Sequence, residues 1–213
     1  TSRSIIARNA SPDIPFDRSI NPYRGCEHGC IYCYARPSHH YLGYSSGLDF
    51  ETRLFVKHDA AELLRAELGR PGYRPAPLAL GSNTDPYQPV ERRLQVTRRI
   101  LEVLAVTHHP VSIVTKSASV LRDLDLLVAM AQRGLVQVAL SVTTLDPALA
   151  RKLEPRAAAP HRRLAAMREL SQAGVPTSLS LAPIIPGLTD HEIERILEVA
   201  RAAGATSASW ILL

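Results

Sequence analysis

Short runs of hydrophobic residues alternate along this chain with longer stretches in which hydrophobic residues recur every three or four positions. The first pattern indicates β-strands and the second indicates amphipathic helices, so their alternation predicts parallel βα units. We expect six strands, and the last five are almost purely apolar, as is typical of strands covered on both faces. The expected strands are residues 20–24, 78–81, 111–115, 136–142, 177–182 and 208–212.

Residues that start and stop helices mark the segments between these strands. Pro160 stands at a typical first-turn position, and Thr189 and Glu192 have the spacing of a capping box. Glycines end most of these segments. The expected helices are residues 59–69, 90–104, 121–134, 160–174 and 189–204, and residues 54–56 are a candidate for an extra short strand.

The order of these elements predicts an α/β fold built on a parallel sheet. Periodicity alone does not distinguish an open, doubly wound sheet from a partial βα barrel. We expect one domain over residues 1–213, with residues 1–19 packing on it as an N-terminal extension. The chain ends on a strand-like run with no helix after it, which is typical of the core of a longer protein.

Composition excludes several classes of protein. Of the 213 residues, 46% are hydrophobic and 21% are charged, and no apolar run reaches the ~18 residues that would span a membrane. The N-terminal segment contains no apolar stretch followed by a cleavage site, so we expect a cytoplasmic protein with no membrane partner. A net charge of +5 is compatible with an anionic partner but does not require one.

All three cysteines lie in one short segment, Cys26-Glu-His-Gly-Cys30-Ile-Tyr-Cys33. An odd number of cysteines argues against a disulfide framework. Three thiolates on one loop can hold three irons of a 4Fe-4S cluster and leave the fourth iron without a protein ligand. The spacing therefore predicts an iron–sulfur site with one open iron, where chemistry can occur.

A zinc site is an alternative for the same cysteines. Three cysteines and one histidine form an ordinary closed zinc set, which one of His28, His39 or His40 would complete. Zinc ligands usually occur as two pairs on separate elements, and this chain has no second C-x-x-C or H-x3-5-H pair. The zinc hypothesis predicts a non-catalytic module that binds nucleic acid or protein. A redox dithiol of the last two cysteines would leave the first without a role.

The C-x3-C-x2-C spacing, with an aromatic residue before the third cysteine, resembles the motif of the radical S-adenosylmethionine (SAM) superfamily. Further stretches resemble one bacterial branch, which is related to spore photoproduct lyase and to DNA-repair photolyase-like proteins. Those stretches are residues 11–16, 19–26, 84–91, 115–117, 122–125 and 154–156. The resemblance extends over nearly the whole chain.

Resemblance to this superfamily implies a partial (β/α)6 barrel with parallel strands and with the cysteine loop after the first strand. It implies a 4Fe-4S cluster and SAM as cofactors, and an electron donor such as flavodoxin or ferredoxin. The superfamily chemistry yields methionine and a 5′-deoxyadenosyl radical, which abstracts hydrogen from a substrate. The branch and the positive charge favour a nucleic-acid substrate, and a peptide or a small metabolite stays open as an alternative.

The resemblance also implies SAM contacts at the ends of the strands. The methionine part is held after the second strand, where this chain departs from the Gly-Gly-Glu pattern of other members. Residues after the third and fourth strands contact the carboxylate and the ribose, and adenine lies against the end of the fifth. The implied contacts are Ser82, Asn83, Thr84, Lys116, Ser141, Ala182 and Ile184.

Tyr32 and Tyr34, which flank the third cysteine, are candidate catalytic residues, because similar tyrosines occur in spore photoproduct lyase, where a nearby cysteine donates hydrogen. All three cysteines of this chain belong to the cluster motif, and Ser82 or its neighbour best matches the donor position. A serine O–H bond is much stronger than a thiol S–H bond. We therefore do not expect thymine-dimer repair of the lyase type.

Asp85, Tyr87 and Glu91 follow the second strand, at the end of the sheet where barrel active sites are built. They are candidate catalytic residues, with a turn role for Asp85 and a helix-dipole role for Glu91 as structural alternatives. Arg156 is a candidate anion-binding residue. The arginine pairs at 92–93, 98–99 and 162–163 are expected on solvated helix faces.

Overall fold

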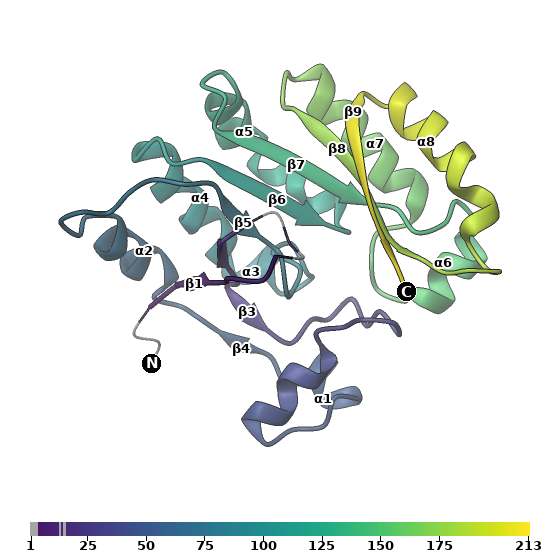
Figure 1. Ribbon diagram of the computed structural model, residues 1–213, viewed down its shortest axis with the longest axis horizontal. Helices are drawn as coiled ribbons and strands as arrows, with labels where there is room; N and C mark the ends of the chain where they lie inside the picture. The colour runs from purple at the N-terminus through teal and green to yellow at the C-terminus, as the bar shows by residue number, and fades with distance from the viewer. Residues whose placement is uncertain (1–3, 13, 15) are drawn as a thin grey trace.

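Seven strands form the central sheet of the computed structural model, which describes residues 4–12, 14 and 16–213 (Figure 1). Asp13 and Pro15, which belong to the resembling stretch 11–16, lie outside the described residues, as do residues 1–3 of the expected N-terminal extension. The strands, in their spatial order, are β1 (Ile6–Arg8), β2 (Arg18–Ile20), β5 (Leu78–Leu80), β6 (Val111–Thr115), β7 (Val136–Ser141), β8 (Thr177–Ile184) and β9 (Ala205–Leu212).

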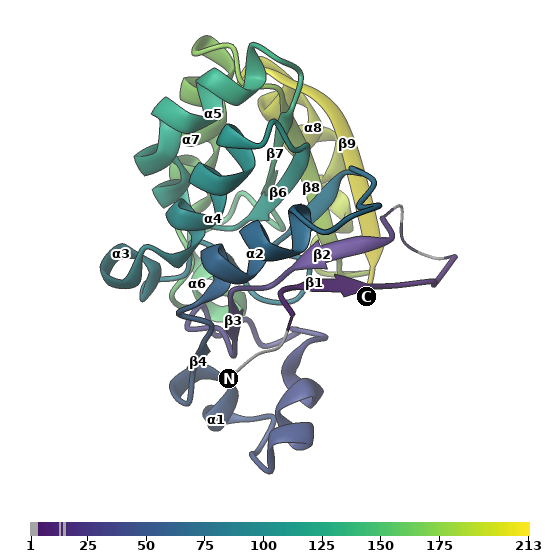
Figure 2. The same cartoon turned by 90° about the vertical axis from the view of Figure 1, so that its left-hand side faces the viewer.

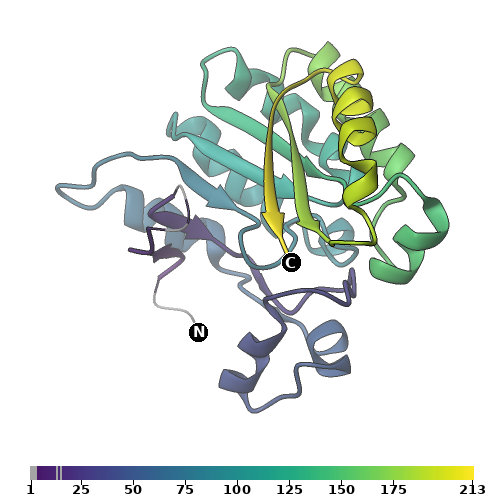
Figure 3. The ribbon, with the colours of Figure 1, turned by 45° about the vertical axis from the view of Figure 1, so that its right-hand side comes forward.

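Six of these strands are parallel, from β2 to β9. Strands β5 to β9 confirm the five apolar strands that were expected, whereas β2 shares only Ile20 with the first expected strand. Among the described strands of this sheet, β1 alone is antiparallel, and it pairs with β2 at one edge. Within the described residues β1 and β9 do not pair, so the sheet curves without closing (Figure 3). The architecture is an α/β partial barrel.

The first expected strand differs from the prediction in its position. The chain leaves the main sheet after Ile20, and β3 (Tyr23–Arg24) pairs instead with β4 (Phe55–Val56) in a separate two-stranded sheet. The extra short strand expected at residues 54–56 is thereby confirmed. Between β3 and β4 the chain forms the 3₁₀ helix η1 (Arg36–Leu42) and α1 (Leu48–Thr52), which project below the sheet (Figure 1).

Helices stack on one face of the sheet, where they cover the apolar strands (Figure 2). They include α2 (Ala60–Leu68), α4 (Val96–Val106), α5 (Leu124–Ala131) and α7 (Pro160–Gln172). Their buried leucines, isoleucines and valines form one continuous core with those of β5 to β8. No helix within the described part of the chain is long and apolar enough to cross a membrane.

The helix expected over residues 90–104 is two helices, α3 (Glu91–Leu94) and α4, because Gln95 has a left-handed backbone with φ of 51°. The break brings the buried carboxylate of Glu91 to the start of α4, where Thr97 N donates to Glu91 Oε2 at 3.1 Å. The hydrophobic pattern continues through this break, so the sequence did not reveal the break. Glu91 is therefore a buried structural acceptor.

The capping box expected at Thr189 and Glu192 was wrong. Thr189 Oγ1 accepts from Ile185 N at 2.9 Å, and a short 3₁₀ turn, η3 (Asp190–Glu192), precedes α8 (Ile193–Ala202). The Glu192 carboxylate instead accepts from Leu145 N at 2.8 Å. It thus fixes the loop that leads from β7 into α6 (Pro147–Leu153).

The expectation that the last strand is covered on both faces was also wrong. The side chains of β9 are exposed along nearly its whole length, and Trp210 is 70% exposed. In the part of the chain that the structure describes, β9 lies at the edge of the sheet and pairs with β8 alone (Figure 3). Apolar composition predicted the strand correctly but not its surroundings.

Candidate active site

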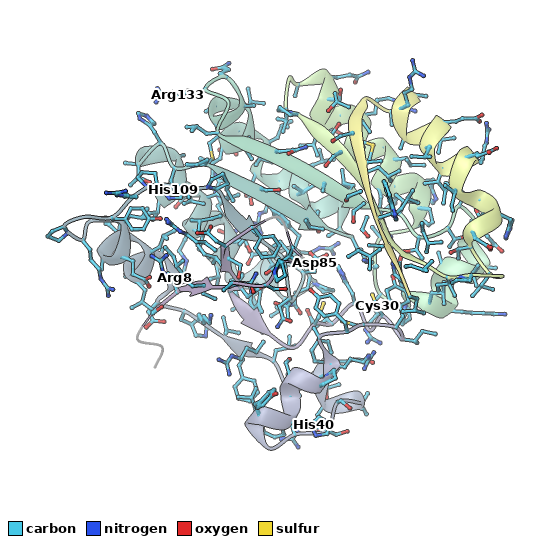
Figure 4. The ribbon with its side chains drawn as sticks, in the orientation of Figure 1. Arg8, Cys30, His40, Asp85, His109 and Arg133 are labelled. Atoms are coloured by element: carbon cyan, nitrogen blue, oxygen red, sulfur yellow. The ribbon has the colours of Figure 1, made fainter. Side chains whose placement is uncertain are left out.

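The cysteine loop follows β3 and lies at the carboxyl ends of the parallel strands (Figure 4). All three cysteines are free thiols; Cys26 is buried, and Cys30 and Cys33 are half-buried. Burial raises the pKa of Cys26, and it raises the pKa of Cys30 to about 11 although nearby Lys116 opposes the shift. Without a metal the first two thiols are therefore protonated, and a metal would bind with release of protons.

A turn at the end of α6 holds this loop from outside. Ile31 N donates to Leu153 O at 3.0 Å, and Arg156 N donates to His28 O at 3.1 Å. Side chains add to these backbone bonds, since Tyr32 Oη donates to the Glu154 carboxylate. Arg156 was expected to bind an anion. Its guanidinium instead donates to the backbone of the cysteine loop and to the carboxylate of Glu51.

Three of the expected SAM contacts meet beside this loop. Lys116, which follows β6, donates from Nζ to Ser141 Oγ at 3.0 Å and to Ala182 O at 3.5 Å. Ser141 Oγ also lies 3.4 Å from Ala182 O. The Lys116 ammonium is 5.8 Å from the ring centre of Tyr32, so the ends of β6, β7 and β8 and the cysteine loop converge.

A buried ion pair lies under this convergence and was missed by sequence reasoning. The guanidinium of Arg163, which is 1% exposed, donates to the Glu154 carboxylate and, at 2.8 Å, to Ser141 O. Arg163 had been expected on a solvated face, which was wrong. Its partner, Glu154, belongs to the stretch 154–156 that resembles the superfamily branch, but no local pattern indicated that the Arg163 side chain is buried.

Ser82 and Asn83 lie at the opposite side of the loop, after β5. Asn21 ties them to the end of β2, since its side chain donates to Ser82 Oγ at 3.2 Å and accepts from Asn83 N at 2.9 Å. The exposed Tyr34 donates from its hydroxyl to Ser82 O. Asn21 is a further site residue that the sequence did not single out.

Other expected site residues are buried or bonded within the protein. Thr84 is buried and donates to Tyr23 O at 2.9 Å. Tyr87 is 1% exposed, and its hydroxyl donates to Asp123 at 3.1 Å, so the structure gives it a place in the core and not on a substrate. The carbonyl of Ile184 accepts from Leu213 N at 3.0 Å and serves the sheet.

Asp85 is a shared hydrogen-bond acceptor at the site. Its carboxylate accepts from Lys116 N and from Thr115 Oγ1, each at 2.7 Å, and from Tyr87 N at 2.8 Å. It also lies 3.4 Å from His28 Nδ1. Burial alone would raise the pKa of Asp85, but His28 and these donors outweigh it and lower the pKa to about 2. Asp85 is therefore an ionised acceptor whose bonds are made within the protein.

Of the three histidines of the zinc alternative, His28 lies within the cysteine loop itself, where its Nδ1 is 3.4 Å from the Asp85 carboxylate. The other two lie in the segment of η1 and α1 below the sheet, here called the lower lobe. There His39 Nε2 bonds with Arg53 O at 3.0 Å, and His40 lies apart from Cys30 (Figure 4). Among the described residues, no three His, Cys, Asp or Glu side chains form a group that would hold a single metal ion.

Free thiols thus lie on a loop at the mouth of an incomplete parallel barrel, next to a cation and hydroxyl at neighbouring strand ends. The family model of the radical SAM superfamily matches residues 20–200. This chain belongs to the radical SAM superfamily. Its fold is an α/β partial barrel that is similar to the fold of spore photoproduct lyase.

Several proteins are similar to this radical SAM chain. An uncharacterised protein of Mycobacterium tuberculosis is 42% identical over 92% of the chain and 58% of its own length. An uncharacterised protein of Methanocaldococcus jannaschii is 30% identical over 81% of the chain and 62% of its own length. The chain thus spans about 58% to 62% of these relatives.

Solved structures share the fold. Spore photoproduct lyase with bound SAM and a dinucleoside spore photoproduct superposes with a TM-score of 0.68 at 18% identity, over 94% of this chain and 56% of that one. SuiB of Streptococcus suis bound to SAM gives 0.59 at 14% identity, over 91% of this chain and 38% of that one. At these identities the likeness concerns the fold.

Proposed function

We propose that Cys26, Cys30 and Cys33 hold a 4Fe-4S cluster beside a SAM site built on Lys116, Ser141 and Ala182. When bound, the reduced cluster supplies one electron that splits SAM into methionine and a 5′-deoxyadenosyl radical, which removes hydrogen from a substrate. The observation that carries this proposal is the convergence of the free thiols with Lys116 and Ser141 at one end of the sheet.

The donor set fits such a cluster. Thiolates are the ligands of iron–sulfur clusters, and three free thiols on one loop can each bind a separate iron of such a cluster. A single zinc ion would need four converging ligands. The wall beside Cys30 carries the positive charge of Lys116, which favours thiolates and an anionic ligand.

The residues of the chain divide the remaining tasks. Lys116 and Ser141 offer a cation and a hydroxyl for the carboxylate and ribose of SAM, and Ser82 and Asn83 offer polar groups on the other side of the loop. The Glu154 carboxylate holds the hydroxyl of Tyr32, which keeps that ring against Lys116. A protein electron donor such as flavodoxin or ferredoxin is required as the source of the electron.

The test is the formation of 5′-deoxyadenosine from SAM by anaerobically reconstituted, reduced protein. Wild type should bind iron and sulfide and form the product, and Cys30→Ala should lose it. Tyr41→Phe, an exposed change in the lower lobe, should behave as wild type. A colourless protein that holds zinc and forms no product would overturn the proposal and favour the zinc module.

We also propose a nucleic acid as the substrate class. Tyr34 is 74% exposed next to Cys33, and Arg24 of β3 lies near Lys57, which follows β4, so two cations stand close together. Exposed aromatic rings and clustered cations are the features with which proteins bind single-stranded nucleic acids. A structurally similar protein binds a dinucleoside, and another binds a precursor peptide.

The salt dependence of binding distinguishes a nucleic-acid substrate from a peptide or a metabolite. A single-stranded oligonucleotide should bind at low salt and weaken steeply as salt rises, because phosphate contacts release counterions. An Arg24→Ala/Lys57→Ala double variant should bind less tightly. Arg133→Ala, at the far end of the sheet, is the control (Figure 4). Absence of binding at low salt would reject a nucleic-acid substrate and favour a peptide or metabolite.

A further inference from the structure

Gln88 spans the first cysteine of the loop. Its side-chain nitrogen Nε2 donates to Gly25 O at 3.2 Å, and its oxygen Oε1 accepts from Glu27 N at 2.9 Å. These two backbone groups belong to the residues on either side of Cys26. Gln88 itself is fully buried. Gln88 lies in the stretch 84–91, which contains several candidate site residues, but the sequence indicated no role for Gln88 itself.

The segment around Cys26 is held at two further points. Glu27 reaches back across the same junction, where its carboxylate accepts from Val90 N. Cys26 N donates to Phe50 O at 2.9 Å. The backbone polar groups on both sides of the cysteine are therefore bonded to segments outside the loop. The two side chains, Gln88 and Glu27, cross between the cysteine loop and the connection from β5 to α3.

We propose that Gln88 is a positioning residue that sets the place of Cys26 in the cluster site. This inference rests on the proposed cluster site. The geometry selects glutamine for a physical reason: one neutral side chain must donate to a carbonyl and accept from an amide at once. Glutamate of the same shape lacks the donor, leucine lacks both groups, and a buried backbone group that loses its partner is costly.

The position of Cys26 can be measured in the chain without metal. A buried thiol reacts with iodoacetamide only when its segment opens, so the alkylation rate reports how firmly the segment is held. In Gln88→Leu, Cys26 should react about tenfold faster, the factor given by losing about 1.4 kcal/mol of hydrogen bonding. Peptide mass spectrometry compares it with Cys30 and Cys33, whose rates should change by no more than about twofold.

Two other variants complete this experiment. Gln137→Leu makes the same chemical change at an exposed position of β7 and should leave all three rates unchanged. Gln88→Glu keeps the shape and the acceptor for Glu27 N but sets a carboxylate oxygen against Gly25 O, so it should also expose Cys26. This isosteric variant tests the inference if Gln88→Leu does not fold.

The reconstituted protein provides a second readout. Iron lost to a chelator under anaerobic conditions should leave Gln88→Leu about tenfold faster than wild type, since residues that orient metal ligands typically contribute this much. Unchanged Cys26 alkylation in both Gln88 variants would overturn the inference. If wild type takes up no iron, the cluster proposal fails, whereas the alkylation pattern still shows whether Gln88 holds Cys26.

Discussion

Lys116 Nζ lies 3.0 Å from Ser141 Oγ, so a cation and a hydroxyl join the ends of β6 and β7. Under the proposed function both groups turn to SAM when it binds. Lys116→Ala should weaken SAM binding by about tenfold or more, because hydrogen bonds to charged groups contribute about 1.5–3 kcal/mol. Calorimetric titration of the reconstituted protein with SAM measures the Kd. Lys152→Ala, on the exposed end of α6, is the control, and an unchanged Kd in Lys116→Ala would contradict the prediction.

The buried pair of Glu154 and Arg163 should dominate the stability of this end of the sheet. Arg163→Met should lower the free energy of unfolding by about 3–5 kcal/mol, because it leaves the Glu154 carboxylate buried without its cation. Urea titration provides the measurement. The double variant Glu154→Leu/Arg163→Met should recover much of the loss, and the exposed Arg162→Met should change stability by less than about 0.5 kcal/mol. A single variant as stable as wild type would show that the pair is dispensable.

Gly81 should not tolerate a side chain. Its φ is 93°, and an added Cβ would lie 2.3 Å from Val114 O, a backbone atom of the neighbouring strand. Gly72 has a similar φ of 79° but open space around it. We expect Gly72→Ala to cost about 1 kcal/mol through backbone strain and Gly81→Ala to cost clearly more through displacement of β6. Thermal and urea unfolding measure the loss of stability in each variant. An equal loss in Gly72→Ala and Gly81→Ala would show that β5 and β6 adjust to the added side chain.

Glu51 should contribute a pH-dependent part of the stability. Burial raises its pKa, but hydrogen bonds from Arg36 and Arg156 outweigh this and lower the pKa below its ordinary 4.5. The ionised carboxylate therefore stabilises the folded chain above pH of about 4.5, and that stabilisation is lost as pH falls through the folded-state pKa. The difference in unfolding free energy between wild type and Glu51→Gln should be constant near neutral pH and shrink in acid. Glu62→Gln, an exposed change on α2, should show no such trend; a difference that grows in acid would contradict the assignment.

The sequence was most informative where the physical cause is local. Apolar runs predicted the five parallel strands β5 to β9, and four of these, β5 to β8, are largely buried, where a strand must be apolar along its own length. Glycine and proline predicted the start and end of α7 for the same reason, since caps depend on backbone conformation. The spacing of the cysteines defined one candidate site before any fold was known. Local patterns did not reveal the break at Gln95, because the apolar face continues through it.

Tertiary structure decided which polar residues meet. Gln88 bonds to residues 61 and 63 positions away, and Tyr32 reaches Glu154 over 122 positions; such pairs depend on how the strands are ordered in the sheet. The same ordering buries Tyr87, which the sequence alone made a candidate catalytic residue, and Arg163, which was expected on a solvated helix face. A residue type states what a side chain can donate or accept, so composition and spacing determined the chemistry that is available to this chain. Only the fold determines which donors and acceptors satisfy one another and which are left to face a ligand.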